Sequence, residues 1–249
     1  MSGHSKWATI KHQKGAKDKA RGKQFAKLIR QVEVAAREGG GDFEGNPTLR
    51  TMFGKARAAS VPLDTIERAV KRGTGELEGV RYEAITYEGY GPSGVAMLVE
   101  TLSDNRNRTG ADVRSLFTKG GGSTAEPGAV SWQFERKGVV SLAKTAGEDE
   151  VMLAALDNGA EDVLDHGDGW EARCAPNDLE QLKAAMEQAG FEVHQAEAMM
   201  VSSNLVPLTD ESEARKVLRL IESLEDLDDV QHVWANFDIS DSVLESVAG

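Results

Sequence analysis

The residues best suited to binding chemistry gather at the start of the chain, where lysines and arginines recur every few positions around one tryptophan. The first thirty residues hold nine Lys/Arg side chains and one acid, Asp18. Cations at this density bind phosphates, and an indole such as that of Trp7 can stack on an unpaired base. We therefore predict that this segment binds a nucleic acid. Folding of Trp7 back onto the protein is the alternative interpretation.

The charge of the whole chain is divided unevenly. Residues 1–72 carry sixteen basic and seven acidic side chains, a net charge of +9, whereas residues 73–249 carry thirteen basic and thirty-four acidic ones, a net charge of -21. A cationic head on an acidic body predicts that the head docks on a polyanion while the body faces away from it. A lysine-rich tail that only keeps the protein soluble is the alternative.

Two later clusters extend the cationic surface. One lies at the C-terminal end of a predicted helix, where complementation of the helix dipole is the alternative role. The other lies in the polar run from Asp104 to Thr109, where Asn107 or Thr109 could instead cap a helix. The predicted nucleic-acid-binding residues are His4, Lys6, Trp7, Lys11, His12, Lys14, Lys17, Arg21, Lys23, Lys27, Arg30, Arg68, Lys71, Arg72, Arg106 and Arg108.

No catalytic or metal-binding pattern accompanies these cations. The five histidines lack the i, i+4 partners or Cys/His clusters of zinc sites. Gly120–Gly122 lacks the Lys-Ser/Thr of a phosphate-binding loop, and the glycines of 89–94 connect two strands, which favours a turn over a dinucleotide fingerprint. Cys174 lies within a predicted strand and is interpreted as an inert buried thiol. The sequence thus predicts no enzyme, metal, cofactor or small-molecule substrate.

Composition favours a cytoplasmic protein. The longest clean apolar run, Val95–Val99, is far shorter than the ~20 residues of a membrane span. No apolar stretch follows the basic N-terminus, as a secretory signal would require. A single cysteine excludes an internal disulfide framework and fits a reducing compartment.

Three short helices are predicted behind the basic segment. Residues 1–20 show no apolar periodicity and are interpreted as a flexible arm. A helical stripe then begins at Phe25 and ends at Gly39–Gly41. Asn46 and Pro47 form the N-cap and first turn of a second helix. A third is predicted over 63–72, ended by Gly73.

The remaining chain alternates strands and helices. Strands are predicted over 82–87, 95–102, 139–143, 161–165, 169–174, 192–200 and 230–238, and helices over 109–119, 148–158, 177–189 and 210–223, with Asn177 as an N-cap. The stretch 139–200 has the order βαββαβ, which closes as a ferredoxin-like split βαβ sheet. The elements on either side of it lack partners unless they pair with each other.

An α+β fold with an insertion follows. The predicted division is a basic arm (1–20), a three-helix domain (21–76), a discontinuous α/β domain (77–129 plus 206–249) and an inserted βαββαβ domain (130–205).

Several motifs in this order resemble the YebC family. They comprise Gly3–Trp7, Ile10–His12, Arg21–Lys23, Lys27–Arg30, Asn46–Pro47, Leu49–Arg50, Ile66–Gly75, Tyr87–Pro92, Asp104–Thr109, Gly120–Gly121, Trp132 with Phe134, and Asn236–Asp238. The resemblance covers nearly the whole chain. It implies an N-terminal helical domain and two α/β domains.

The resemblance also implies a role in gene expression without choosing its target. Members are described as transcriptional regulators; some bind promoter DNA, whereas others activate translation or help ribosomes through proline-rich stretches. The residues favour RNA, because the lysine-rich segment is punctuated by glycine and no helix is dedicated to reading bases. We therefore expect a non-enzymatic translation factor that binds ribosomal RNA or tRNA on the ribosome. A DNA-binding transcription regulator is the alternative.

Overall fold

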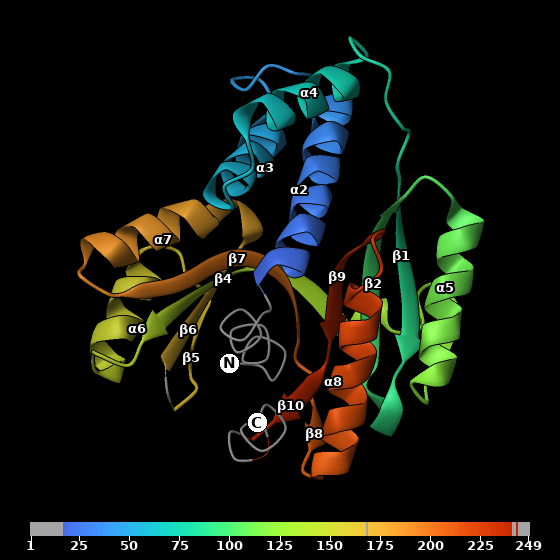
Figure 1. Cartoon of the computed structure of the whole chain (residues 1–249). Helices are drawn as coiled ribbons and strands as arrows, with labels where there is room; N and C mark the ends of the chain where they lie inside the picture. Colours follow the sequence, from blue (N-terminus) through green and yellow to red (C-terminus); the bar gives the residue numbers. More distant parts are fainter. Residues whose placement is uncertain (1–16, 168, 241–242, 244–249) are drawn as a thin grey trace.

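The computed structural model describes residues 17–167, 169–240 and 243. It is a mixed structure in which three helices precede two antiparallel sheets, which confirms the predicted fold class. Figure 1 shows the three helices together at one end of the molecule, with the long helix α2 reaching toward the two sheets. None of the described helices combines the length and apolarity needed to span a bilayer.

The helical domain consists of α2 (Lys17–Gly39), α3 (Pro47–Ala58) and α4 (Leu63–Thr74). Asn46 caps α3 as predicted: its side chain accepts the Leu49 N–H at 3.0 Å, and its amide donates to the carbonyl of Ala35 at 2.8 Å. The core residues of this domain all come from residues 25–70. Helix α2 begins at Lys17, so residues 17–20 of the predicted arm are helical; residues 1–16 lie outside the described part of the chain.

The sequence predicted that Gly73 ends α4, but the helix continues past it to Thr74. It is buried inside the helix, where an added Cβ would lie 2.4 Å from the carbonyl oxygen of Glu33 and 2.7 Å from the Cβ of Ala36. Glycine is needed here because α2 and α4 approach each other closely. The helix is closed by Gly75, which has φ +84°.

The first sheet has the strand order β3-β1-β2-β9, with all neighbours antiparallel. It joins β1 (Glu83–Tyr90), β2 (Ala96–Ser103) and the short β3 (Ser123–Ala125) to β9 (Val230–Ala235), more than a hundred residues away. Helices α5 (Arg106–Lys119) and α8 (Glu211–Glu225) pack on one face of it. A two-stranded parallel sheet of β8 (Val206–Leu208) and β10 (Phe237–Ile239) lies beside it.

The second sheet has the order β5-β6-β4-β7, all antiparallel, which is the split βαβ arrangement. Its strands are β4 (Phe134–Ala143), β5 (Asp162–Asp165), β6 (Gly169–Cys174) and β7 (Val193–Ser202). Helices α6 (Glu148–Asp157) and α7 (Leu179–Gln188) share its core.

The two sheets meet through the faces that their helices leave uncovered. On β2, Met97 and Val99 face α5 and α8, whereas Ala96 and Leu98 join a cluster with Val139 of β4, Met199 of β7 and Trp234 of β9. Strand β2 is therefore buried on both faces. This burial explains why Val95–Val99 is continuously apolar instead of alternating.

Some local predictions were wrong because capping residues compete over short distances. Asn105, not Asn107 or Thr109, caps α5 and accepts the Arg108 N–H at 3.1 Å. Asn177 does not cap α7; it lies in a 3₁₀ turn, Pro176–Asp178, that precedes this helix. Strand β3 lies in a stretch for which no strand was predicted, and the predicted strand 230–238 is divided into β9 and β10 at Asn236.

The division into domains, with 130–205 inserted into a discontinuous domain, stays a prediction that fragments can test. Residues 130–205 expressed alone are expected to unfold cooperatively, because their α6–α7 core is complete within the segment. Residues 80–129 alone are expected not to fold, because β2 would lose β9 and the core would lose α8. Circular dichroism and urea unfolding of both fragments check this. A folded 80–129 fragment would refute the discontinuous domain.

Candidate nucleic-acid interface

One side of α2 carries three of the predicted phosphate-binding cations, and all three contact the chain itself. We call Lys23, Lys27 and Arg30 the cationic face, and residues 225–229, which join α8 to β9, the acidic turn. The Nζ of Lys23 lies 2.9 Å from Oδ1 of Asp226. The Nζ of Lys27 donates to the carbonyl of Glu225 at 2.8 Å, and Nη1 of Arg30 donates to that of Asp228 at 2.6 Å.

Asp229 is the centre of this contact. Its buried carboxylate accepts hydrogen bonds from Arg30 Nη1 at 2.9 Å, from Arg108 Nη2 at 2.6 Å and from the Thr109 hydroxyl at 2.6 Å. Burial alone would raise its pKa, but the hydrogen bonds from Thr109 and Arg108 and the two guanidinium charges lower the pKa below the ordinary value of an aspartate. Arg108 donates hydrogen bonds to Asp229 and to Asp104, and both raise its pKa, the one to Asp229 more strongly. Arg108 thus has a structural partner from a distant segment.

A polar cleft of about 570 Å³ opens where α2, the start of α5 and the acidic turn meet. Its charged lining residues are Lys23, Arg30, Asp104, Arg108, Asp112, Asp226, Asp228 and Asp229. Five acids against three cations give the lining a net negative charge. In this arrangement the cleft repels phosphates, so the cations that line it are not a polyanion site while the acidic turn occupies them.

Arg72 also has a structural role. Its Nε lies 2.8 Å from Oε2 of Glu33, whose side chain is buried, and Arg37 approaches the other oxygen of that carboxylate at 3.3 Å. Because a buried carboxylate needs cationic or hydrogen-bonding partners, Arg72 stabilises the packing of α4 on α2, while Arg37 supports the same carboxylate from within α2. Arg106, by contrast, makes an exposed ion pair with Glu83 at 3.3 Å.

The helical domain keeps other cations at its surface. Arg68 and Lys71 lie three residues apart on α4 and are both exposed. Arg50 and Arg57 are also exposed, and their i, i+7 spacing puts them on one face of α3. This second pair was not among the predicted binding residues, because its members are seven positions apart in the sequence and only helical spacing brings them to one face.

Part of the predicted site lies outside the described residues. This part comprises His4, Lys6, Trp7, Lys11, His12 and Lys14. For Lys17 and Arg21 the structure describes a helical backbone at the start of α2. Among the described residues, the exposed cations of α3 and α4 can continue the basic segment, whereas those of the cationic face on α2 are paired with the acidic turn.

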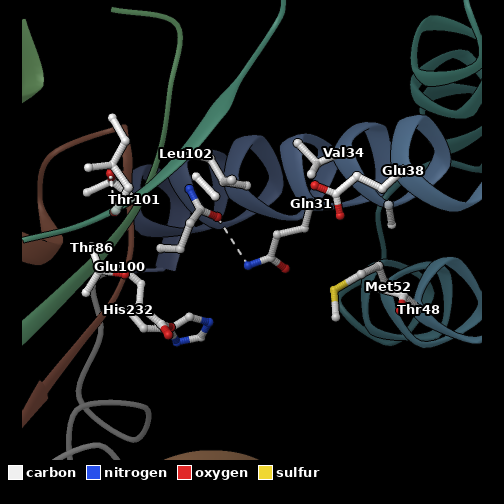
Figure 2. A pocket seen from close by; sticks show the side chains of 14 residues that line it. Gln31, Val34, Glu38, Thr48, Met52, Thr86, Glu100, Thr101, Leu102 and His232 are labelled. Atoms are coloured by element: carbon white, nitrogen blue, oxygen red, sulfur yellow. Dashed lines mark hydrogen bonds between the residues drawn. The ribbon is translucent and has the colours of Figure 1, made fainter. Parts of the chain in front are cut away.

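A second, mostly apolar cleft of about 280 Å³ separates the helical domain from the first sheet. Figure 2 shows Gln31, Val34 and Met52 facing Thr101, Leu102 and His232 across it. One hydrogen bond crosses the cleft, from Nε2 of Gln31 to Oε1 of Gln231 at 3.1 Å. Burial lowers the pKa of His232 and so favours the neutral imidazole, whose ring stacks on the indole of Trp234.

The described residues contain no cluster of His, Cys, Asp or Glu that could hold a metal ion. Cys174 is buried, and burial raises the pKa of its thiol, which disfavours the reactive thiolate. Its burial is what the sequence suggested.

Family models match the chain in two adjoining parts. Residues 5–76 match a model described as the TACO1/YebC protein N-terminal domain, and residues 82–237 match one described as the TACO1/YebC second and third domain. The chain is 57% identical over 246 residues to a protein of Salinispora arenicola, covering 98% of each chain. It is 58% identical over 250 residues to one of Frankia casuarinae, covering 99% of each. Both relatives are named probable transcriptional regulatory proteins.

A solved structure shares the fold. The crystal structure of a conserved hypothetical protein from Aquifex aeolicus matches with a TM-score of 0.78 and 44% sequence identity, over 92% of this chain and 95% of that one.

Proposed function

This chain belongs to the TACO1/YebC family, and from that premise we propose that it is a non-enzymatic, nucleic-acid-binding regulator of gene expression that acts on the RNA of the translation machinery. Its partners would be ribosomal RNA or tRNA on the ribosome, in the cytoplasm. Assistance to the synthesis of difficult sequences, such as proline-rich ones, is the role we favour. The names of the relatives support a regulator of gene expression in general.

The observation that carries the proposal is the division of charge between the two parts of the chain. The head, residues 1–72, has a net charge of +9 and the body, residues 73–249, has -21. The helical domain adds exposed cations on α3 and α4 to those of the basic segment. Such a molecule approaches a polyanion with the helical domain first, because turning the body toward it costs electrostatic energy.

RNA is favoured over duplex DNA on physical grounds. A body of net charge -21 opposes the wrapping of a duplex around the protein. An aromatic residue among glycines and lysines suits unpaired bases, which folded RNA exposes in its loops. The protein would make and break no bond. It would hold RNA in a geometry that favours the ribosome's own chemistry.

A DNA-binding transcription regulator is the second candidate, and the names of the relatives favour it. Cosedimentation with ribosomes, run beside a promoter-DNA shift assay at the same salt concentration, separates the two. We expect cosedimentation at a salt concentration that abolishes the DNA shift. A DNA shift without ribosome binding would transfer the proposal to transcription.

Exposed cations of α4 should contribute directly to binding. Replacing Arg68 and Lys71 with glutamine removes up to two phosphate-binding side chains, so the slope of log affinity against log salt should fall by about 0.7–0.9 for each phosphate that is no longer neutralised. Fluorescence anisotropy with a labelled single-stranded RNA measures the slope. The matched control is Lys216→Gln with Arg219→Gln, which removes two exposed cations from α8 in the acidic body and should leave the slope unchanged. Equal slopes for the α4 variant and wild type would show that Arg68 and Lys71 do not contact the nucleic acid.

A further inference from the structure

The acidic turn presents oxygen atoms to the cationic face much as a nucleic-acid backbone would. Lys23 contacts both the carbonyl and the carboxylate of Asp226, at 3.0 and 2.9 Å. Lys27 and Arg30 reach the carbonyl oxygens of Glu225 and Asp228. Lysine and arginine bind phosphate oxygens with the same groups and at similar distances. The cationic face is therefore chemically a phosphate-binding surface whose present occupant belongs to the same chain.

The contact between the helical domain and the body is weakly packed. Of the buried clusters formed by described residues, none mixes core side chains of the helical domain with those of the body. The apolar cleft of Figure 2 lies between the two parts. Polar contacts also join the two parts: Lys23 pairs with Asp226, and Lys55 pairs with Glu197 at 3.0 Å. An interface of this kind can separate without exposing a domain core.

The connection between the two parts is irregular, although Nη1 of Arg37 on α2 donates to the carbonyl of Val80 at 2.9 Å. Residues 75–82 contain no helix or strand, and residues 75–81 are exposed. The helical domain has its own core within residues 25–70, so it can move as a unit. If the contact between Asp229 and Arg30 broke, Asp229 would still accept hydrogen bonds from Arg108 and Thr109, so its carboxylate would not be left unpaired. Opening thus leaves no buried charge unpaired on the body.

We propose that the cationic face of α2 is a second polyanion-binding surface and that the acidic turn competes with the polyanion for it. In the structure the turn covers the face; a single-stranded nucleic acid displaces the turn and tilts the helical domain away about residues 75–82. The inference rests on the proposed function, since it assumes a nucleic-acid ligand. Asp226 is 77% exposed and Lys23 is 33% exposed. Ion pairs as accessible as this one contribute little to stability, so phosphates can replace it. The more buried pair of Arg30 with Asp229 is the contact that resists displacement.

Neutralising the turn tests the competition. The turn variant carries Glu225→Gln, Asp226→Asn and Asp228→Asn. It removes the carboxylate that pairs with Lys23 and two neighbouring negative charges, and it leaves Asp229 and the backbone carbonyls that contact Lys27 and Arg30 in place. The control carries Glu148→Gln, Asp149→Asn and Glu150→Gln, three exposed acids at the start of α6, so the change in net charge is the same. Binding of a fluorescein-labelled 20-nucleotide oligouridylate is measured by anisotropy. The turn variant should bind about 5–10-fold more tightly than wild type. The control should bind at most about 2-fold more tightly, because it shares only the change in long-range charge.

Removing Lys23 and Lys27 from both wild type and the turn variant shows whether the added affinity comes from the cationic face. Lys23→Gln with Lys27→Gln should weaken binding only slightly in wild type, where the turn occupies both amines. In the turn variant the same pair should lose most of the added affinity. Spin labels at Thr51→Cys on α3 and Glu180→Cys on α7, with Cys174→Ala, report the movement: the distance distribution should shift when the RNA is added.

The outcomes separate this inference from the function it rests on. Equal affinity of the turn variant and the control would overturn the competition while leaving RNA binding in place. An unchanged distance distribution with bound RNA would overturn the movement of the domain. Failure of wild type and all variants to bind the RNA would refute the proposed function together with this inference.

Discussion

Replacing Asp229 with alanine is expected to lower the free energy of unfolding by about 2–4 kcal/mol, because one buried carboxylate joins three distant parts of the chain. It binds Arg30 from α2, Arg108 and Thr109 from α5, and accepts a longer contact from Ser103 at the end of β2. Alanine leaves the Thr109 hydroxyl and the two guanidinium groups without their shared acceptor. Urea unfolding followed by circular dichroism at pH 7 measures the loss.

The effect should depend on pH in a defined direction. Because the folded protein holds the pKa of Asp229 below its ordinary value, the carboxylate stabilises the fold fully above the unfolded pKa of ~3.9. That contribution is lost as the pH falls through the lower folded pKa. The gap between wild type and Asp229→Ala should therefore be constant near neutrality and shrink below about pH 4.

The neighbouring Asp228 provides the control. It is exposed, and the contact that it gives Arg30 comes from its backbone carbonyl. Asp228→Ala keeps that carbonyl and should change the unfolding free energy by less than about 0.5 kcal/mol. Equal losses in the two variants would show that Asp229 is not the centre of the contact.

The elements of this fold could be predicted from local patterns. The stripe starting at Phe25 gave the first helix, and Asn46 before Pro47 gave the start of the second. The βαββαβ order in the second half led to the split βαβ sheet. Each of these signals lies within a few residues of the feature it specifies. Boundaries failed where two polar residues could each cap the same helix, as at Asn105 and Thr109.

The arrangement of the candidate site could not be predicted in the same way. The cations of α2 meet carbonyl and carboxylate oxygens about 200 residues later, as Lys23 does with Asp226. A charge count shows both groups but not their contact, because any cation can pair with any acid. For the same reason the sequence did not distinguish Arg72, which neutralises buried Glu33, from exposed Arg68 on the same helix. Gly73 was misread as the end of a helix because its role depends on the close approach of α2, which the local sequence does not show.

Replacing Lys6, Trp7 and Lys11 together with alanine is expected to abolish the effect of this protein on stalled translation while leaving its thermal transition unchanged. These residues precede the described part of the chain, in a stretch whose sequence shows no apolar periodicity and therefore predicts no contribution to a core. A reconstituted translation system that stalls on a proline-rich template measures the activity. Circular dichroism on heating checks the fold.

The expected loss is large because the three side chains would act together. Ordering a segment on RNA costs roughly 1–2 kcal/mol of backbone entropy per residue, so several contacts are required before binding becomes favourable. Removing two phosphate-binding lysines and one stacked ring takes away a large share of them. Lys6→Arg with Lys11→Arg is the control, because it keeps both charges and should retain the activity. A triple alanine variant that rescues normally would show that the cations of α3 and α4 suffice, and wild type that never affects translation but shifts promoter DNA would favour transcription.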